Sequence, residues 1–128
     1  MYVMYKKFPV FKNRNVQKVY HSTPELQRSF TAGEKLEIQI ATMWMEEGYE
    51  PVAIAQHTKI RIQEIGRIIN ACENCFKAYE KGIKLSEIAD FYSISMHLAF
   101  YYILMGIQNK INEMLGEQML NIVETSEN

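Results

Sequence analysis

Apolar and polar positions alternate along most of this chain with the spacing of a helix. From Leu36 to Met45, the apolar side chains include pairs three and four positions apart, and a stripe with steps of three and four runs from Leu104 to Ile122. This spacing predicts helices that bury one face. Thr31-Ala32-Gly33-Glu34 has the pattern of a capping box, so the helix through Leu36 should begin there and stop at Gly48.

Proline and glycine mark the limits of the next helices. Pro51 should open a short helix that runs to about His57, followed by a turn at Thr58-Lys59-Ile60. The helix after this turn should start near Arg61. It should continue to Tyr79 or Glu80, because no glycine or proline interrupts the chain between positions 66 and 82.

Three further helices follow from similar signals. Ser22-Thr23-Pro24-Glu25 is an N-cap pattern with proline at the first helical position, which predicts a short helix to about Ser29. Another short helix should begin at Ser86. The last helix should start near Ser95 and run beyond Glu113, with fraying after about position 123.

The first 21 residues differ from the rest. Aromatic and β-branched side chains are mixed with lysines, and Pro9 and Asn13-Arg14-Asn15 are turn signals. The segment 1–21 is therefore predicted to form a short β-hairpin or an extended arm, in a chain that is otherwise all-α.

Two segments set 34 positions apart resemble each other, one starting at Met45 and the other at Tyr79. The matched pairs are Glu46 with Glu80, Gly48 with Gly82, Ile54-Ala55 with Ile88-Ala89, Ile60 with Ile94, and Ile69 with Ile103. Each copy has the spacing of a helix-turn-helix. We therefore expect a first unit over 22–81 and a second over 82–123 that share a long central helix, with an acidic tail at 124–128.

The first copy carries the residue types that a helix-turn-helix needs. Ala55 allows the second helix to cross closely, Ile60 plugs the turn, and Ile65 and Ile68 anchor the second helix. The stretch from Gly48-Tyr49-Glu50-Pro51 through Ile54-Ala55 to Ile60, then from Ile65 to Ile69, resembles the helix-turn-helix DNA-binding family, especially the sigma-factor region-four type. Lys59 stands at the turn where many members carry glycine.

This resemblance implies that the helix starting near Arg61 enters the major groove of double-stranded DNA. Its outward positions are Arg61, Ile62, Gln63, Gly66 and Arg67. Arg and Gln side chains match the edges of guanine and adenine, and Lys59 with the first amides of that helix is suited to a phosphate. Further phosphate contacts are expected from the basic arm, at Lys6, Lys7, Lys12, Arg14 and Lys18.

The second copy has diverged at the matching positions, which are Ser95, Met96, His97, Phe100 and Tyr101. The large apolar side chains favour a structural or partner-binding role for this copy. Ser95, His97 and Tyr101 stay open as contacts to phosphates or thymine methyl groups.

The same spacing also fits two structures that bind no DNA. One is a helical hairpin that only packs, and four acidic residues near the first copy favour it because they oppose the approach of phosphate: Glu46, Glu47, Glu50 and Glu64. The other is a tetratricopeptide array, whose period is also 34 residues, but two copies fall below the roughly three that a solenoid needs.

No cofactor, metal or catalytic activity is predicted. Cys72 and Cys75 form a C-x-x-C inside a predicted helix, where zinc would need two more ligands and a redox role would need a preceding strand. Both are therefore expected to be core cysteines. The sequence contains no carboxylate pair around a nucleophile, no phosphate loop and no serine elbow.

Composition sets wider limits. The chain has 128 residues, 48% of them hydrophobic and 23% charged, which is typical of one globular domain. The net charge of −1 gives no overall attraction to nucleic acid, although the chain is basic up to Arg28 and acidic after Lys110. No apolar run approaches the roughly 18 residues of a membrane helix, so a cytoplasmic protein is expected.

The sequence thus predicts an all-α DNA-binding transcriptional regulator that dimerises through its C-terminal helix. The competing hypotheses are an adaptor that docks on a protein of the transcription machinery and a DNA-packaging or replication accessory. The richness in Ile, Lys, Met and Tyr is typical of a phage or mobile element of a low-GC bacterium.

Overall fold

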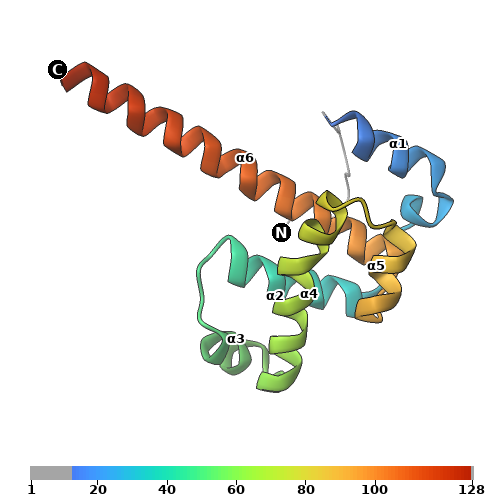
Figure 1. Ribbon diagram of the computed structural model, residues 1–128. Coiled ribbons are helices and arrows are strands. Elements are labelled where there is room, and N and C mark those ends of the chain that lie inside the picture. Colours follow the sequence, from blue (N-terminus) through green and yellow to red (C-terminus); the bar gives the residue numbers. More distant parts are fainter. Residues whose placement is uncertain (1–12, 128) are drawn as a thin grey trace.

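The computed structural model describes residues 13–127, and their side chains as far as Glu117. Within this range every regular element is helical, which confirms the predicted all-α class. The elements are α1 (Arg14–Ser22), the 3-10 helix η2 (Pro24–Gln27), α2 (Ala32–Met45), α3 (Pro51–Thr58), α4 (Ile62–Glu80), α5 (Leu85–Tyr92) and α6 (Met96–Glu127). Figure 1 shows that α6 starts inside the body and projects far out of it.

Helix α1 corrects the prediction of a strand-like arm for the described part of residues 1–21. Asn13, taken as part of a turn, is instead the N-cap: its Oδ1 accepts hydrogen bonds from Asn15 N at 2.9 Å and Val16 N at 3.2 Å. Val16, Val19 and Tyr20 lie on one face and pack against the core. Burial of this helical face outweighs the β-propensity of Val and Tyr. Residues 1–12 lie outside the described part of the chain.

The capping box at the start of α2 is confirmed. Thr31 Oγ1 accepts a hydrogen bond from Glu34 N at 3.2 Å, and Glu34 Oε1 accepts one from Thr31 N at 2.9 Å. The helix ends at Met45, slightly before the predicted stop. Gly48 follows in the left-handed region with φ +72°, so the chain reverses where glycine is least strained.

The 34-residue repeat is a repeat of backbone geometry. In the described chain, the residues with positive φ form two pairs at this offset: Gly48 (+72°) with Gly82 (+86°), and Lys59 (+63°) with Ser93 (+55°). Helices α3 and α5 are each eight residues long and start 34 positions apart, as do α4 and α6. The two units are therefore α2–α3–α4 and α4–α5–α6, and the predicted sharing of a long central helix is confirmed.

The predicted packing residues of both units lie in or against one core. Ile65 and Ile68 of α4 are buried, and Ala55 and Ile60 are partly buried against the core. In the second unit the buried positions include Ile88, Ala89 and Ala99. The αL conformation of Lys59 shows that the turn keeps the geometry favoured by glycine despite its side chain.

Helices α4 and α6 cross closely at the centre of the molecule. A Cβ added at Gly106 of α6 would stand 2.4 Å from the Cβ of Phe76, which shows why this position has no side chain. Beside this crossing, Lys110 Nζ lies 2.7 Å from Glu80 Oε2. The helix then continues as a regular backbone to Glu127, beyond the fraying point expected near position 123.

Candidate nucleic-acid interface

The start of α4 presents most of the predicted DNA-contacting residues to solvent. Lys59, Arg61 and Gln63 are exposed, and within residues 13–127 their side chains make no hydrogen bond or ion pair. Arg61 is the N-cap residue of α4, and its side chain makes no capping hydrogen bond to the first turn. Ile62 is also exposed. This arrangement leaves two cations and an amide side chain available to a ligand.

Gly66 lies on the same exposed stretch of α4. A Cβ built there would meet no atom within 4 Å. Glycine inside a helix costs roughly 0.5–1 kcal/mol relative to alanine, and packing within the described chain gives no reason for it. An open glycine on a solvent-facing helix surface allows another molecule to approach the backbone closely.

Arg67 is less available than the sequence suggested. Its Nε donates to Glu64 Oε1 at 2.7 Å, and its Nη2 lies 3.3 Å from Glu37 Oε1. The hydrogen bond with Glu64 raises the pKa of Arg67 above its usual value, and the guanidinium in turn lowers the pKa of Glu64. A base contact by Arg67 would have to compete with two carboxylates, one of which, Glu37, was not foreseen because it comes from α2.

The second-unit candidates His97 and Tyr101 are corrected by the structure. They are 1% and 4% exposed, and both rings pack on Phe30: the His97 ring stacks at a centroid distance of 3.8 Å and the Tyr101 ring meets it edge-on at 5.5 Å. Phe100, which matches Gly66, packs against Tyr20 with their ring centroids 6.0 Å apart. The N-terminal elements α1 and η2, with the residues that follow them, thus cover one face of α6. The corresponding face of α4 is exposed.

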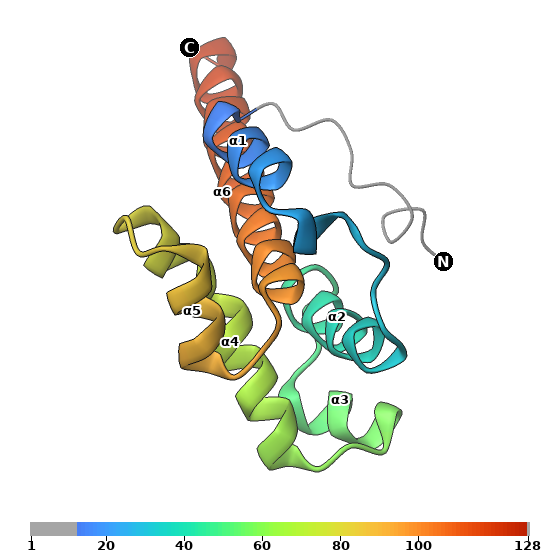
Figure 2. The ribbon, with the colours of Figure 1, turned by 90° about the vertical axis from the view of Figure 1, so that its right-hand side faces the viewer.

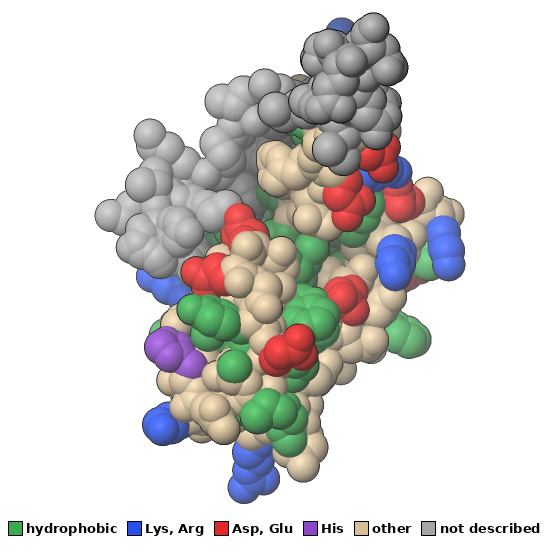
Figure 3. Space-filling model, turned by 90° about the vertical axis from the view of Figure 1, so that its left-hand side faces the viewer, with side chains coloured by type: hydrophobic (Ala, Val, Ile, Leu, Met, Phe, Trp, Pro, Cys, Tyr) green, Lys and Arg blue, Asp and Glu red, His purple; other side chains and the backbone are tan. Residues whose placement is uncertain are grey.

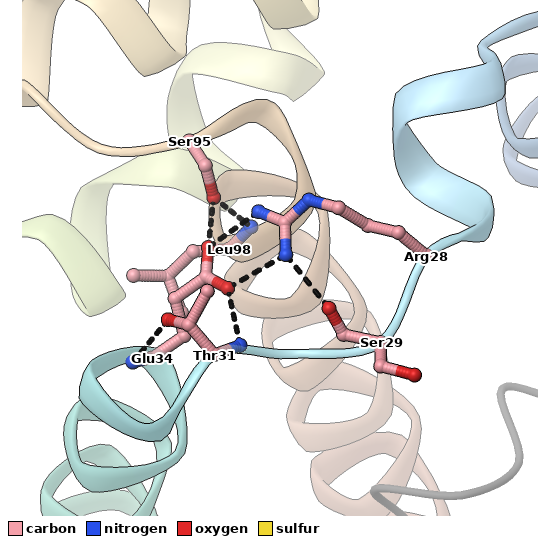
Figure 4. Close-up of polar contacts among 6 residues, drawn as sticks. All are labelled: Arg28, Ser29, Thr31, Glu34, Ser95 and Leu98. Atoms are coloured by element: carbon pink, nitrogen blue, oxygen red, sulfur yellow. Dashed lines mark hydrogen bonds and ion pairs between the residues drawn. The ribbon is translucent and has the colours of Figure 1, made fainter.

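Ser95 is engaged in a polar network rather than free for phosphate, as Figure 4 shows. Its Oγ accepts a hydrogen bond from Leu98 N at 3.0 Å, which caps α6, and donates to Glu34 Oε2. Arg28 donates two hydrogen bonds to the same carboxylate, from Nη1 to Oε1 at 2.9 Å and from Nη2 to Oε2 at 2.8 Å. Burial alone would raise the pKa of Glu34, but the hydrogen bonds from Arg28 and Ser95 outweigh it and lower this pKa to about 2.

This Glu34 network joins three segments that are distant in sequence: the linker after η2, the start of α2 and the start of α6. The capping box revealed Glu34 in the sequence, whereas nothing in the pattern indicated Arg28 or Ser95 as its partners. The network fixes the N-terminal segment over the second unit. Oε1 and Oε2 of Glu34 each accept two of these hydrogen bonds, so the role of the network is structural.

The basic residues of the N-terminal segment do not join the α4 surface. Arg14 and Lys18 are exposed on α1, and Figures 1 and 2 place α1 and α3 at opposite ends of the body. Contacts to DNA from both regions would therefore involve separate surfaces. Lys6, Lys7 and Lys12 lie outside the described residues.

Surface charge around α3 and α4 is mixed. On the face drawn in Figure 3, acidic and apolar side chains are interspersed and the basic side chains stand toward the edges. Glu46, Glu47 and Glu50 are exposed in the turn between α2 and α3. Attraction to a polyanion would be local to the start of α4.

The cysteine pair lies in the core, as predicted. Cys72 and Cys75 are buried, and burial raises the pKa of both thiols, to about 12 for Cys75. In the part of the chain that the structure describes, no group of three or more His, Cys, Asp and Glu side chains could hold a metal ion. In the same part, no single helix has the length and apolar character to cross a membrane.

Comparison with models of protein families, with curated proteins and with solved structures found no match.

Proposed function

We propose that this chain binds double-stranded DNA through the start of α4 and acts as a small transcriptional regulator. The observation that carries the proposal is the contrast between the units. The first leaves Arg61, Gln63 and Gly66 exposed at the start of α4. In the second unit His97 and Phe100, which match Gln63 and Gly66, are buried and packed against the N-terminal segment of the chain. A surface left open in one of two equal scaffolds is the natural place for a ligand.

The side chains and the helix end fit that ligand. Arg61 and Lys59 supply charge for phosphates beside the first amides of α4. Gln63 carries the paired donor and acceptor that match an adenine edge. The predicted duplex contact is therefore centred on the first two turns of α4.

A salt titration of binding to random duplex DNA tests the proposal. We expect a complex that weakens with salt, and we expect Lys59→Ala/Arg61→Ala to bind more weakly and to reduce the slope of log K against log salt by about 0.9 for each lost phosphate contact. Lys81→Ala/Lys84→Ala removes two exposed lysines between α4 and α5 and serves as the matched control. Unchanged binding in the first variant would show that α4 does not contact DNA.

Selection from a random duplex pool tests the regulatory part of the proposal. Enrichment of one sequence supports a regulator. Binding without any preferred sequence would instead support a packaging or replication accessory.

A second candidate function is an adaptor that docks on a protein of the transcription machinery. Two observations favour it: Glu37 and Glu64 hold Arg67 on the α4 surface, and the matching face of α6 binds a helical segment of the same chain. Binding to purified RNA polymerase that is lost in Ile62→Ser/Gln63→Ala, with no binding to duplex DNA, would establish the adaptor and refute the DNA-binding proposal.

A further inference from the structure

The projecting half of α6 carries an apolar face that the described chain leaves uncovered. The last side chain tied to the body is Lys110, which bonds to Glu80 and lies 5.8 Å from the ring centroid of Phe76. Beyond it, Figure 1 shows α6 standing free of the other helices. Ile111, Met114 and Leu115 are 44%, 53% and 52% exposed there.

These side chains continue a seam that begins in the core. Leu104 and Ile107 are partly buried against the core, and Ile111 and Met114 follow at intervals of four and three residues. Alternating steps of three and four place side chains along one side of a helix, as in helices that pair with another helix. The seam therefore runs from the body onto the free part of α6.

By analogy with the repeat, a third short helix of the same chain could cover the seam, but the residues on α6 argue against it. Gly116 stands 34 positions after Gly82, where a third short helix would branch off. In the second unit, α5 packs against α4 near the buried Cys75, which lies close to Tyr92 of α5. The matching residue of α6 is the exposed Asn109, so a third short helix would find a polar surface there. Accordingly, α6 remains helical through Gly116.

We propose that a second copy of this chain covers the seam, so that two α6 helices pair in a homodimer. Among the described side chains of the free segment, the charged ones are Glu113 and Glu117. At 100° per residue, both lie more than about 100° around the helix from the mean direction of Ile111, Met114 and Leu115. A second copy can therefore cover the seam without removing a carboxylate from water, which would be costly. The seam is self-complementary because it is apolar along its described length.

The expected dimer is of moderate strength. The segment from Ile111 to Glu127 has 17 residues, or roughly 25 Å at 1.5 Å per residue. Three half-exposed side chains from each copy form a small interface, so we expect a dissociation constant in roughly the micromolar range. This proposal concerns association alone and does not rest on DNA binding.

Sedimentation equilibrium of the full chain through the micromolar range tests the dimer. The native chain should approach twice its mass of 15.0 kDa as concentration rises. Ile111→Ser/Leu115→Ser should stay at the single-chain mass, with helical circular dichroism showing that the body is folded. Ile83→Ser/Phe91→Ser removes two exposed apolar side chains of the second unit away from the seam and should dimerise like the native chain.

Three results would overturn the proposal: a single-chain mass at every concentration, a dimer that survives the change at Ile111 and Leu115, or a dimer lost in the Ile83 and Phe91 control. The last of these would place the contact between copies on α5 instead of α6.

Discussion

Gly66→Ala separates what the fold needs at the start of α4 from what a ligand needs there. The fold should benefit from the change, because alanine restricts the unfolded chain more than glycine does and a helix interior accommodates it. The new Cβ would meet no atom within 4 Å, so no steric cost opposes this benefit. A ligand that approaches the backbone at Gly66 would instead collide with the added methyl group.

The two effects have opposite signs and useful sizes. Replacing a helical glycine by alanine stabilises by roughly 0.5–1 kcal/mol, which corresponds to a rise in Tm of about 2–5 °C in a chain of this length. Inserting a methyl group into a close interface costs roughly 1–3 kcal/mol, so duplex DNA should bind roughly 5- to 150-fold more weakly. Weaker binding by a more stable protein cannot be explained by misfolding.

Thermal unfolding and fluorescence anisotropy with a labelled duplex measure the two effects on the same preparation. Gly33→Ala is the matched control: it is another exposed helical glycine with no atom within 4 Å of its Cβ position, at the start of α2 rather than on the α4 surface. We expect unchanged DNA affinity in this control. Full affinity in Gly66→Ala would refute a close approach at this glycine, while salt-sensitive binding by the native chain would leave DNA binding itself standing.

Three further predictions concern the core and its polar network. Glu34→Gln should lower the free energy of unfolding in urea by about 2 kcal/mol, because Arg28 loses its charged partner; no loss would mean that the network contributes nothing to stability. Burial lowers the pKa of His97 from 6.5 to about 4, so the free energy of unfolding should fall as pH drops from about 6.5 to 4. It should fall further from about pH 4.5 toward 2 as Glu34 is protonated. His97→Phe should flatten the first part of this pH profile. Gly106→Ala should destabilise by roughly 1–3 kcal/mol, because its Cβ would collide with Phe76; an unchanged urea midpoint would show that α4 and α6 can separate without cost.

The sequence predicted the helices and turns of the repeat well because their signals are local. The capping box at Thr31, the proline at position 51 and the glycines at 48 and 82 each act within one turn of backbone. Buried isoleucines at helical spacing then identified the core side of α3 and α4. These features depend on neighbouring residues alone, so they are legible without knowledge of the tertiary fold.

The errors came from contacts between distant segments. Val16, Val19 and Tyr20 have strand-like composition, and only their packing against the core makes α1 favourable. The sequence favoured a structural or partner-binding role for the second copy but left His97 and Tyr101 open as DNA contacts. Phe30, 67 positions before His97 in sequence, buries them, and no periodicity within either segment reveals that pairing.

The divergence of the two copies decides how such a chain could read DNA. At matching backbone positions the first unit has Gly66 and the second has Phe100. Phe100 packs against Tyr20, so this face of α6 is covered. Among the described residues, one chain therefore offers a single open surface of this kind, at α4, which is too small for strong sequence selection. Selective binding would need two such surfaces held together, and pairing through α6 would supply the second. If sequence selection by the native chain persists in the monomeric Ile111→Ser/Leu115→Ser variant, this link between association and recognition is wrong.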